Sequence, residues 1–184
     1  MKRKYFFAAL LSSLFFIAPS QAQITKATLQ ASGLTCSMCS NAINKSLKSL
    51  DFVDKVTANI KNSSFDISFK PGTKVGIDRL KEKVEDAGFF VASLTAAIHF
   101  DNTTVANDTH VDIDGTTFHF INVNDETITG ERTIKILDKG YVTAKAFKQN
   151  SKYTTMECYK TGKASGCCSK SGIAEGARIY HVTI

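Results

Sequence analysis

Beyond its first residues the chain has no apolar stretch approaching the ~20 residues that a membrane-spanning helix needs. It also lacks a basic stripe with interleaved aromatic residues, which argues against binding to nucleic acid. Motifs for catalysis are missing as well, because no Ser/His/Asp order, paired-carboxylate motif or glycine-rich phosphate loop stands out. The sequence therefore does not predict a membrane-embedded protein, a nucleic-acid-binding protein or an enzyme.

The first 22 residues have the pattern of a cleaved export signal. Basic residues 2–4 precede an apolar segment at 5–17, and Ser20-Gln21-Ala22 is a small-x-small pattern, so we expect cleavage after Ala22. No cysteine follows that position, which argues against a bacterial lipid anchor. Three of the 23 basic residues lie in this segment, which leaves 20 against 17 acidic residues and an ordinary net charge of +3. We expect a soluble periplasmic or secreted protein that meets the membrane only through its signal peptide.

Five cysteines follow the signal, and two of them lie three residues apart in Gly33-Leu34-Thr35-Cys36-Ser37-Met38-Cys39. Residues 26–32 alternate as a half-buried strand does, and apolar residues recur at helical spacing after Cys39. The pair is therefore predicted on a strand-to-helix loop, with Cys39 near the start of the helix. Unpaired N–H groups and the helix dipole favour a thiolate there.

Two thiolates without a neighbouring histidine or carboxylate favour a soft metal ion. Cu(I) suits them best, and Hg(II), Cd(II) or Zn(II) would also bind. A closed structural zinc site is not expected, because Zn(II) prefers four ligands and this loop supplies two. The alternatives are an inert or disulfide-bonded pair and a thioredoxin-like redox pair, although Thr35 stands where that redox motif usually has tryptophan. Met38 is expected to face solvent.

The region around the pair has the element order β-α-β-β-α-β, which predicts a ferredoxin-like sandwich of the split βαβ type. Gly88 is placed to cap the second helix in the left-handed conformation. The expected elements are strands at 26–32, 53–60, 65–69 and 89–94 and helices at 39–50 and 77–87.

Residues 24 to about 97 resemble the heavy-metal-associated domain family, which includes copper chaperones, metal-binding repeats of copper-transporting P-type ATPases and the periplasmic mercury-binding protein. Two motifs carry the resemblance: residues 33–39, against G-M-T/H-C-x-x-C, and residues 85–89 (Glu-Asp-Ala-Gly-Phe), against E-D-A-G-Y/F. The resemblance implies metal binding by Cys36 and Cys39. It also implies that Leu34, where the family usually has methionine, fills core volume beneath the loop, and that Phe89 lies beside it.

The rest of the chain matches no family that we recognise and is predicted to be mainly β. We expect domains at 23–98 and 109–184, the second small and β-rich, joined by a polar linker at 99–108. Asp114-Gly115 is a strong signal for a two-residue hairpin turn. The other elements expected here are strands at 110–113, 116–123, 132–137 and 177–184 and a short helix within 143–152.

Three further cysteines follow the pattern C-x8-C-C in a glycine-containing loop: Cys158, Cys167 and Cys168. One interpretation is a disulfide from Cys158 to one of the other two, which would staple a small domain. The other is a second soft-metal site of two or three thiolates. The four histidines, His99, His110, His119 and His181, show no ligand pattern and are expected to be surface or packed residues.

The sequence thus predicts an exported Cu(I) chaperone or scavenger that passes its metal to a partner, such as a metal-transporting membrane protein. A periplasmic mercury-binding protein is the alternative within this class. A thiol-disulfide exchange protein, or an adaptor acting through the C-terminal region, are the alternatives from other classes.

Overall fold

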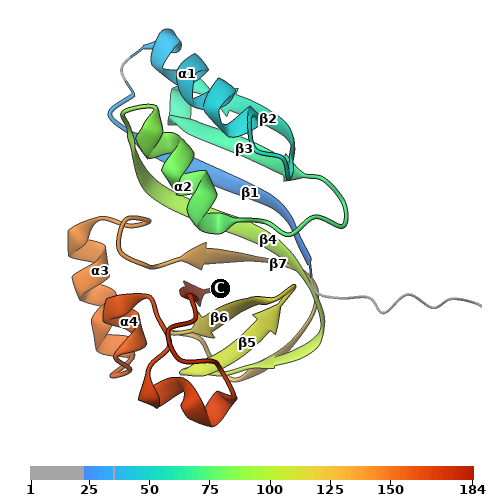
Figure 1. Cartoon of the computed structure of the whole chain (residues 1–184), viewed down its shortest axis with the longest axis vertical. Helices are drawn as coiled ribbons and strands as arrows, with labels where there is room; N and C mark the ends of the chain where they lie inside the picture. The colour runs from blue at the N-terminus through green and yellow to red at the C-terminus, as the bar shows by residue number, and fades with distance from the viewer. Residues whose placement is uncertain (1–22, 35) are drawn as a thin grey trace, which may run out of the picture.

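The computed structural model describes residues 23–34 and 36–184. The expected signal peptide at residues 1–22 and Thr35 of the predicted metal loop lie outside the described residues, as does the side chain of Cys167. No helix in the described part of the chain is long and apolar enough to cross a membrane. The strands of both halves of the chain form one sheet, and helices pack along it (Figure 1).

The first half of the chain forms the predicted βαββαβ unit. Its elements are β1 (Gln23–Ser32), α1 (Ser37–Lys48), β2 (Val53–Asn59), β3 (Ser64–Phe69), α2 (Ile77–Asp86) and β4 (Phe90–Val105), with a short 3₁₀ turn, η1 (Ile60–Asn62), before β3. The strands pair in the order β2-β3-β1-β4, and each pair is antiparallel. Helices α1 and α2 lie side by side over this part of the sheet (Figure 1). This is the ferredoxin-like arrangement expected from the sequence.

Gly88 ends α2 as the sequence predicts. Its φ of 85° is in the left-handed region, and its N–H donates to the carbonyl of Glu85 over 2.8 Å. The N–H of Phe89 donates to the carbonyl of Val84 over 3.1 Å, which completes a Schellman motif. The motif turns the chain directly from α2 into β4.

Strand β4 departs from the prediction, because it continues through the residues expected to form a linker at 99–108. Its second part pairs with β7 (Glu126–Ile136), with a register shift between Phe100 and Thr103. Residues 101–104 are polar and mostly exposed, so their side chains show no apolar alternation. Asn102 has a positive φ of 46° at the register shift, and the ladder with β7 resumes at Thr103 and Thr104, since strand hydrogen bonds do not depend on side-chain polarity.

The second half of the chain adds four strands to the same sheet. They are β5 (Thr109–Ile113), β6 (Thr116–Phe120), β7 and β8 (Ile179–Thr183), in the order β4-β7-β8-β6-β5, with β6 and β8 parallel. The hairpin between β5 and β6 is confirmed, because Asp114 and Gly115 have φ values of 54° and 66°. The short helix expected within 143–152 is α3 (Ala144–Asn150), and the chain adds α4 (Cys158–Thr161) and the 3₁₀ turns η2 (Ser151–Tyr153) and η3 (Gly166–Ser171).

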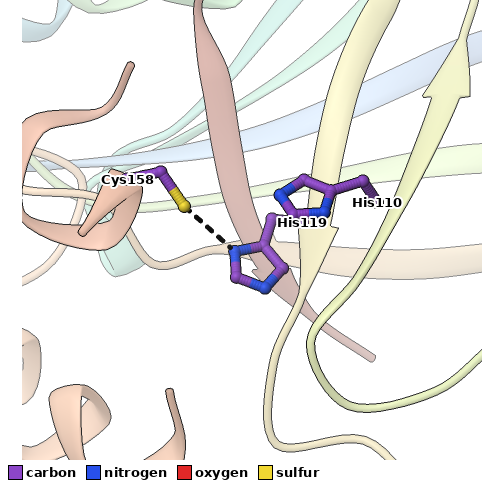
Figure 2. A group of neighbouring side chains, drawn as sticks. All are labelled: His110, His119 and Cys158. Carbon is purple, nitrogen blue, oxygen red and sulfur yellow. Dashed lines mark hydrogen bonds between the residues drawn. The ribbon is translucent and has the colours of Figure 1, made fainter. Parts of the chain in front are cut away.

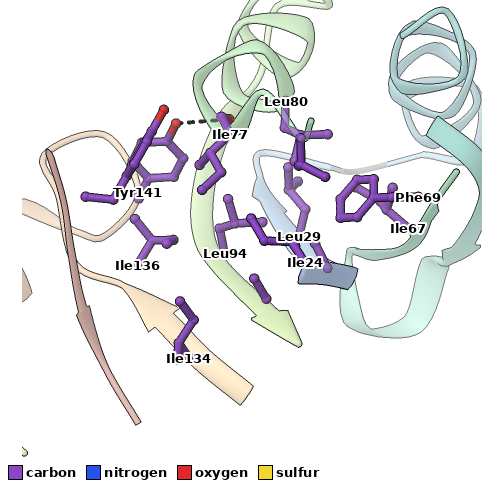
Figure 3. Close-up of a cluster of buried hydrophobic side chains, with 14 of the residues drawn as sticks. Ile24, Leu29, Ile67, Phe69, Ile77, Leu80, Leu94, Ile134, Ile136 and Tyr141 are labelled. Atoms are coloured by element: carbon purple, nitrogen blue, oxygen red, sulfur yellow. Dashed lines mark hydrogen bonds between the residues drawn. The ribbon is translucent and has the colours of Figure 1, made fainter. Parts of the chain in front are cut away.

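One hydrophobic core extends through both halves. Figure 3 shows Leu94 of β4 between the residues of the first unit and Ile136 of β7. Tyr141, which follows β7, is fully buried, and its hydroxyl donates a hydrogen bond toward the Ile77 carbonyl (3.1 Å) and the Asp78 carboxylate (2.7 Å) at the start of α2. Because the sheet and the core are shared, the structure does not set residues 109–184 apart as a small domain of their own.

Candidate metal centre

Cys36 and Cys39 lie at the start of α1, on the exposed loop that follows β1. Cys36 is the N-cap residue of the helix, with an extended backbone (φ −150°, ψ 160°), and its sulfur accepts a hydrogen bond from the Cys39 N–H over 3.4 Å. Cys39 lies in the first turn, and the two sulfurs are 2.7 Å apart. The local fold therefore directs both sulfurs to the same place, where a single metal ion can contact both.

The helix N-terminus stabilises the ionised form of Cys36. Its pKa is lowered first by the hydrogen bond with the Cys39 side chain and then by the backbone N–H groups of Cys39 and Met38. These donors are among the N–H groups that no helical carbonyl accepts. Because the thiolate is the form that binds metal, the cap prepares an exposed ligand.

The residues around the loop hold it in place. Leu34 is partly buried and packs against the main core, as its predicted volume-filling role requires. Gly33 has a φ of 83°, and a Cβ atom there would lie 4.0 Å from the Phe89 ring, so Phe89 lies beside the loop as expected. Met38 is 82 % exposed, in agreement with the prediction that it faces solvent.

The loop offers two ligands and open space for a third. With metal–sulfur bonds of about 2.3 Å, two thiolates would lie roughly 3.8 Å apart at a tetrahedral ion and further apart at a linear one. The sulfurs must therefore separate by about 1 Å or more when an ion binds. Exposed residues at a helix N-terminus can make such a movement without disturbing the core.

The later cysteines lie in the other half of the molecule. Cys158 begins α4, Cys168 lies in η3, and both are fully buried in a small cluster with Ala164 and Ile179. The Cys167 side chain lies outside the description, so the predicted disulfide and the predicted site of two or three thiolates both stay predictions.

The structure places histidines around Cys158, which the sequence did not lead us to expect. Sheet pairing sets His110 opposite His119 and sets His119 beside His181, so three histidines form a row across β5, β6 and β8. His119 Nδ1 lies 3.7 Å and His181 Nε2 lies 3.5 Å from the Cys158 sulfur. Figure 2 shows the stacked rings of His110 and His119 with Cys158 pointing toward them.

Part of this histidine row could have been predicted from the sequence. A two-residue turn at Asp114-Gly115 fixes the hairpin register and places His110 across from His119. The parallel pairing of β6 with β8 joins segments about 60 residues apart, and no local pattern predicts it. His99 is exposed on β4 and takes no part in the row.

Comparison with known proteins finds similarity in the first half of the chain. The model of the heavy-metal-associated domain matches residues 28–90, which include Cys36 and Cys39. The copper chaperone CopZ of Bacillus subtilis is 35% identical over 65 residues, which cover 35% of this chain and 93% of CopZ.

Two other relatives are much longer than the matched segment. A probable copper-transporting ATPase, HMA5, from Arabidopsis thaliana is 33% identical over 66 residues, or 36% of this chain. A copper-exporting P-type ATPase from Staphylococcus saprophyticus is 36% identical over 63 residues, or 34% of this chain. The chain spans 6% and 8% of the lengths of these two ATPases.

Among solved structures, a CopZ metallochaperone is 25% identical, with 37% of this chain and 100% of that chain covered and a TM-score of 0.35. Oxidized MerP from Ralstonia metallidurans CH34 is also 25% identical, with 39% and 94% covered and a TM-score of 0.34. The sequence matches, with Bacillus subtilis CopZ covered over 93% of its length, show that through residues 28–90 this chain belongs to the heavy-metal-associated domain family.

Proposed function

We propose that this protein binds Cu(I) through Cys36 and Cys39 and passes it to a partner outside the cytoplasm. The observation that carries the proposal is the position of the two sulfurs, 2.7 Å apart at an exposed helix N-terminus, where the hydrogen bond with the Cys39 side chain lowers the pKa of Cys36. Two thiolates form a soft donor set, and Cu(I) is the soft ion that such a set prefers. Relatives named as copper chaperones and copper-transporting ATPases support copper as the cargo.

The open coordination of the loop favours transfer over storage. An incoming thiolate can bind the ion before the first Cu–S bonds break, in the way that thiols exchange at a disulfide. A membrane transporter with its own cysteine pair is the kind of partner that fits. The export signal expected at residues 1–22 supports a periplasmic or secreted location.

Mercury capture is the second candidate function. It is favoured by the similarity to MerP and by the affinity of Hg(II) for two thiolates. Metal analysis of protein purified anaerobically from its native compartment separates the two candidates. Copper in excess of mercury supports the copper proposal, and mercury alone contradicts it.

Competition against a Cu(I) chelator tests the ligands. The double variant Cys36→Ser/Cys39→Ser should bind one Cu(I) fewer per chain than the native protein, while Met38→Ala, an exposed neighbour in the same loop, should bind as many as the native protein. Circular dichroism should show the same fold in all three, because the loop lies outside the core. Unchanged Cu(I) binding in the double variant would contradict the proposal.

Thiol trapping in the native compartment tests the alternative that Cys36 and Cys39 take part in thiol-disulfide exchange. Only thiolates bind metal, so metal-loaded protein should carry Cys36 and Cys39 in the reduced form. A pair that is fully oxidised under copper-replete conditions would favour the thiol-disulfide alternative.

A further inference from the structure

The row of histidines on β5, β6 and β8 ends at Cys158 and places nitrogen and sulfur donors within reach of one ion. One donor atom from each of His110, His119 and Cys158 lies within 4.8 Å of the other two. His181 Nε2 lies 3.5 Å from the same sulfur, although His181 is not a member of this set of mutually close donor atoms. His119, His181 and Cys158 are fully buried, so the group is part of the interior and not a chance cluster on the surface.

Carboxylates on the far side orient two of the imidazoles. The Asp108 carboxylate accepts a hydrogen bond from His119 Nε2 over 3.1 Å, and the Asp138 carboxylate accepts one from His181 Nδ1 over 2.9 Å. Each ring therefore turns its other nitrogen, with a lone pair, toward the Cys158 sulfur. A carboxylate behind a histidine is the usual outer shell of a protein metal site.

The spacing of the donors matches a tetrahedral ion. Bonds of about 2.3 Å to sulfur and about 2.05 Å to nitrogen put the two ligand atoms roughly 3.6 Å apart. The Cys158 sulfur lies 3.7 Å from His119 Nδ1 and 3.5 Å from His181 Nε2. The pre-existing distances thus need little adjustment for these three ligands.

The histidine nitrogens of the cluster have lone pairs available for an ion. A Cys158 thiol has one proton, whereas His119 and His181 both direct a nitrogen lone pair at its sulfur. Among the described residues, His110 Nε2 is a buried nitrogen with no hydrogen-bond partner. A cation beside the Cys158 sulfur would therefore find nitrogen donors close by.

His110 also provides a route for an ion. It is partly exposed and lines a surface cavity of about 320 Å³ together with Asp112, Thr117 and Ser171. An ion can therefore reach the cluster from solvent past the ring of His110. Entry from solvent is one of the requirements of a working metal site.

We propose that Cys158, His119 and His110 form a second metal site, which binds a divalent ion of borderline softness such as Zn(II), and that His181 moves toward the ion to become its fourth ligand. Three imidazoles and one thiolate suit four-coordinate Zn(II), whereas the two thiolates of the loop suit Cu(I). In this site the partners of Cys158 are histidines, whereas the sequence suggested the thiolates of Cys167 and Cys168.

A catalytic role for the Cys158–His181–Asp138 series does not fit. Such a series resembles a thiol nucleophile with its base and orienting carboxylate. A nucleophile must meet its substrate, however, and the Cys158 side chain is fully buried. A small ion can reach this sulfur where a substrate cannot.

The test uses the full chain with Cys36→Ser/Cys39→Ser, so that the loop contributes no thiolate. Anaerobic titration with Co(II) as the probe should give one ion per chain, with the intense visible bands of tetrahedral Co(II) and a thiolate-to-cobalt charge-transfer band. Added Zn(II) should displace the Co(II) and raise the melting temperature of the chain.

Adding Cys158→Ser should remove the charge-transfer band and weaken Zn(II) binding at least tenfold. His110→Ala, at the exposed edge of the cluster, should weaken binding with the fold retained by circular dichroism. The matched control His99→Gln, an exposed histidine on β4, should leave both unchanged. The proposal is wrong if the loop variant binds no Co(II), or if the charge-transfer band survives Cys158→Ser.

Discussion

At the scale of single residues, contacts with Cys39 at the start of α1 explain the lowered pKa of Cys36. Cys36 accepts the Cys39 N–H and interacts with the Cys39 sulfur, and both interactions favour its thiolate. These interactions prepare Cys36 for the role of metal ligand that we propose for the pair.

The lowered pKa of Cys36 predicts how fast it is alkylated. In the metal-free chain, the rate of iodoacetamide attack on Cys36 should reach its half-maximum at a pH below the ordinary cysteine value, because the thiolate is the nucleophile. Cys39→Ser removes the largest cause of the shift, so the midpoint should move upward. Mass spectrometry of the peptide containing Cys36 gives the rates, and a midpoint that stays fixed in Cys39→Ser would contradict the role of the pair.

At the scale of elements, the first half of the chain could be predicted because its signals are local. The helical period, the Gly88 cap and the Asp114-Gly115 turn each depend on neighbours in sequence. The extension of β4 could not be predicted in this way, because Thr103 and Thr104 are held by pairing with β7, about 25 residues further along the chain. The histidine row could not be predicted for the same reason, because it requires β6 to pair with β8, which is distant in the sequence.

Gly88 provides a stability test of the element that connects α2 to β4. Its φ is 85°, and a Cβ atom would meet nothing within 4 Å, so Gly88→Ala changes only the backbone preference. We expect the free energy of unfolding to fall by about 1–2 kcal/mol, the cost of a left-handed residue with a side chain. Urea denaturation measures the change.

Gly166→Ala is the matched control, because a Cβ atom there also has open space and the backbone does not adopt a positive φ. Its free energy of unfolding should change by much less. Equal losses in the two variants would show that the left-handed cap is not the cause.

At the scale of the whole molecule, the two halves of the sheet depend on each other to different degrees. The first unit matches a copper chaperone over 93% of that chaperone's length, so we expect the first unit to fold without the second half. The second half is not expected to fold without the first, because β7 has its longest pairing with β4. Tyr141 and Tyr180 of the second half are also buried in the common core.

Two fragments test this asymmetry. Residues 23–98 should fold as a monomer with slow amide exchange in β1 and β3. Residues 106–184 lack β4 and should show little protection in β7 and β8, because the edge of β7 and the core beneath it become exposed. Hydrogen exchange followed by mass spectrometry decides it, and protection in the second fragment equal to that in the full chain would contradict a shared fold.

The most direct measurement of the central claim is an anaerobic nitrogen-15 NMR titration of the reduced chain with Cu(I). The Cys158→Ser background keeps the second cluster from contributing a thiolate. One equivalent of Cu(I) should shift the amide signals of Gly33, Cys36–Ser40 and Phe89 and leave those of β5 to β8 in place. If the loop signals stay unchanged while copper binds, Cys36 and Cys39 are not the site, and the proposed function is wrong.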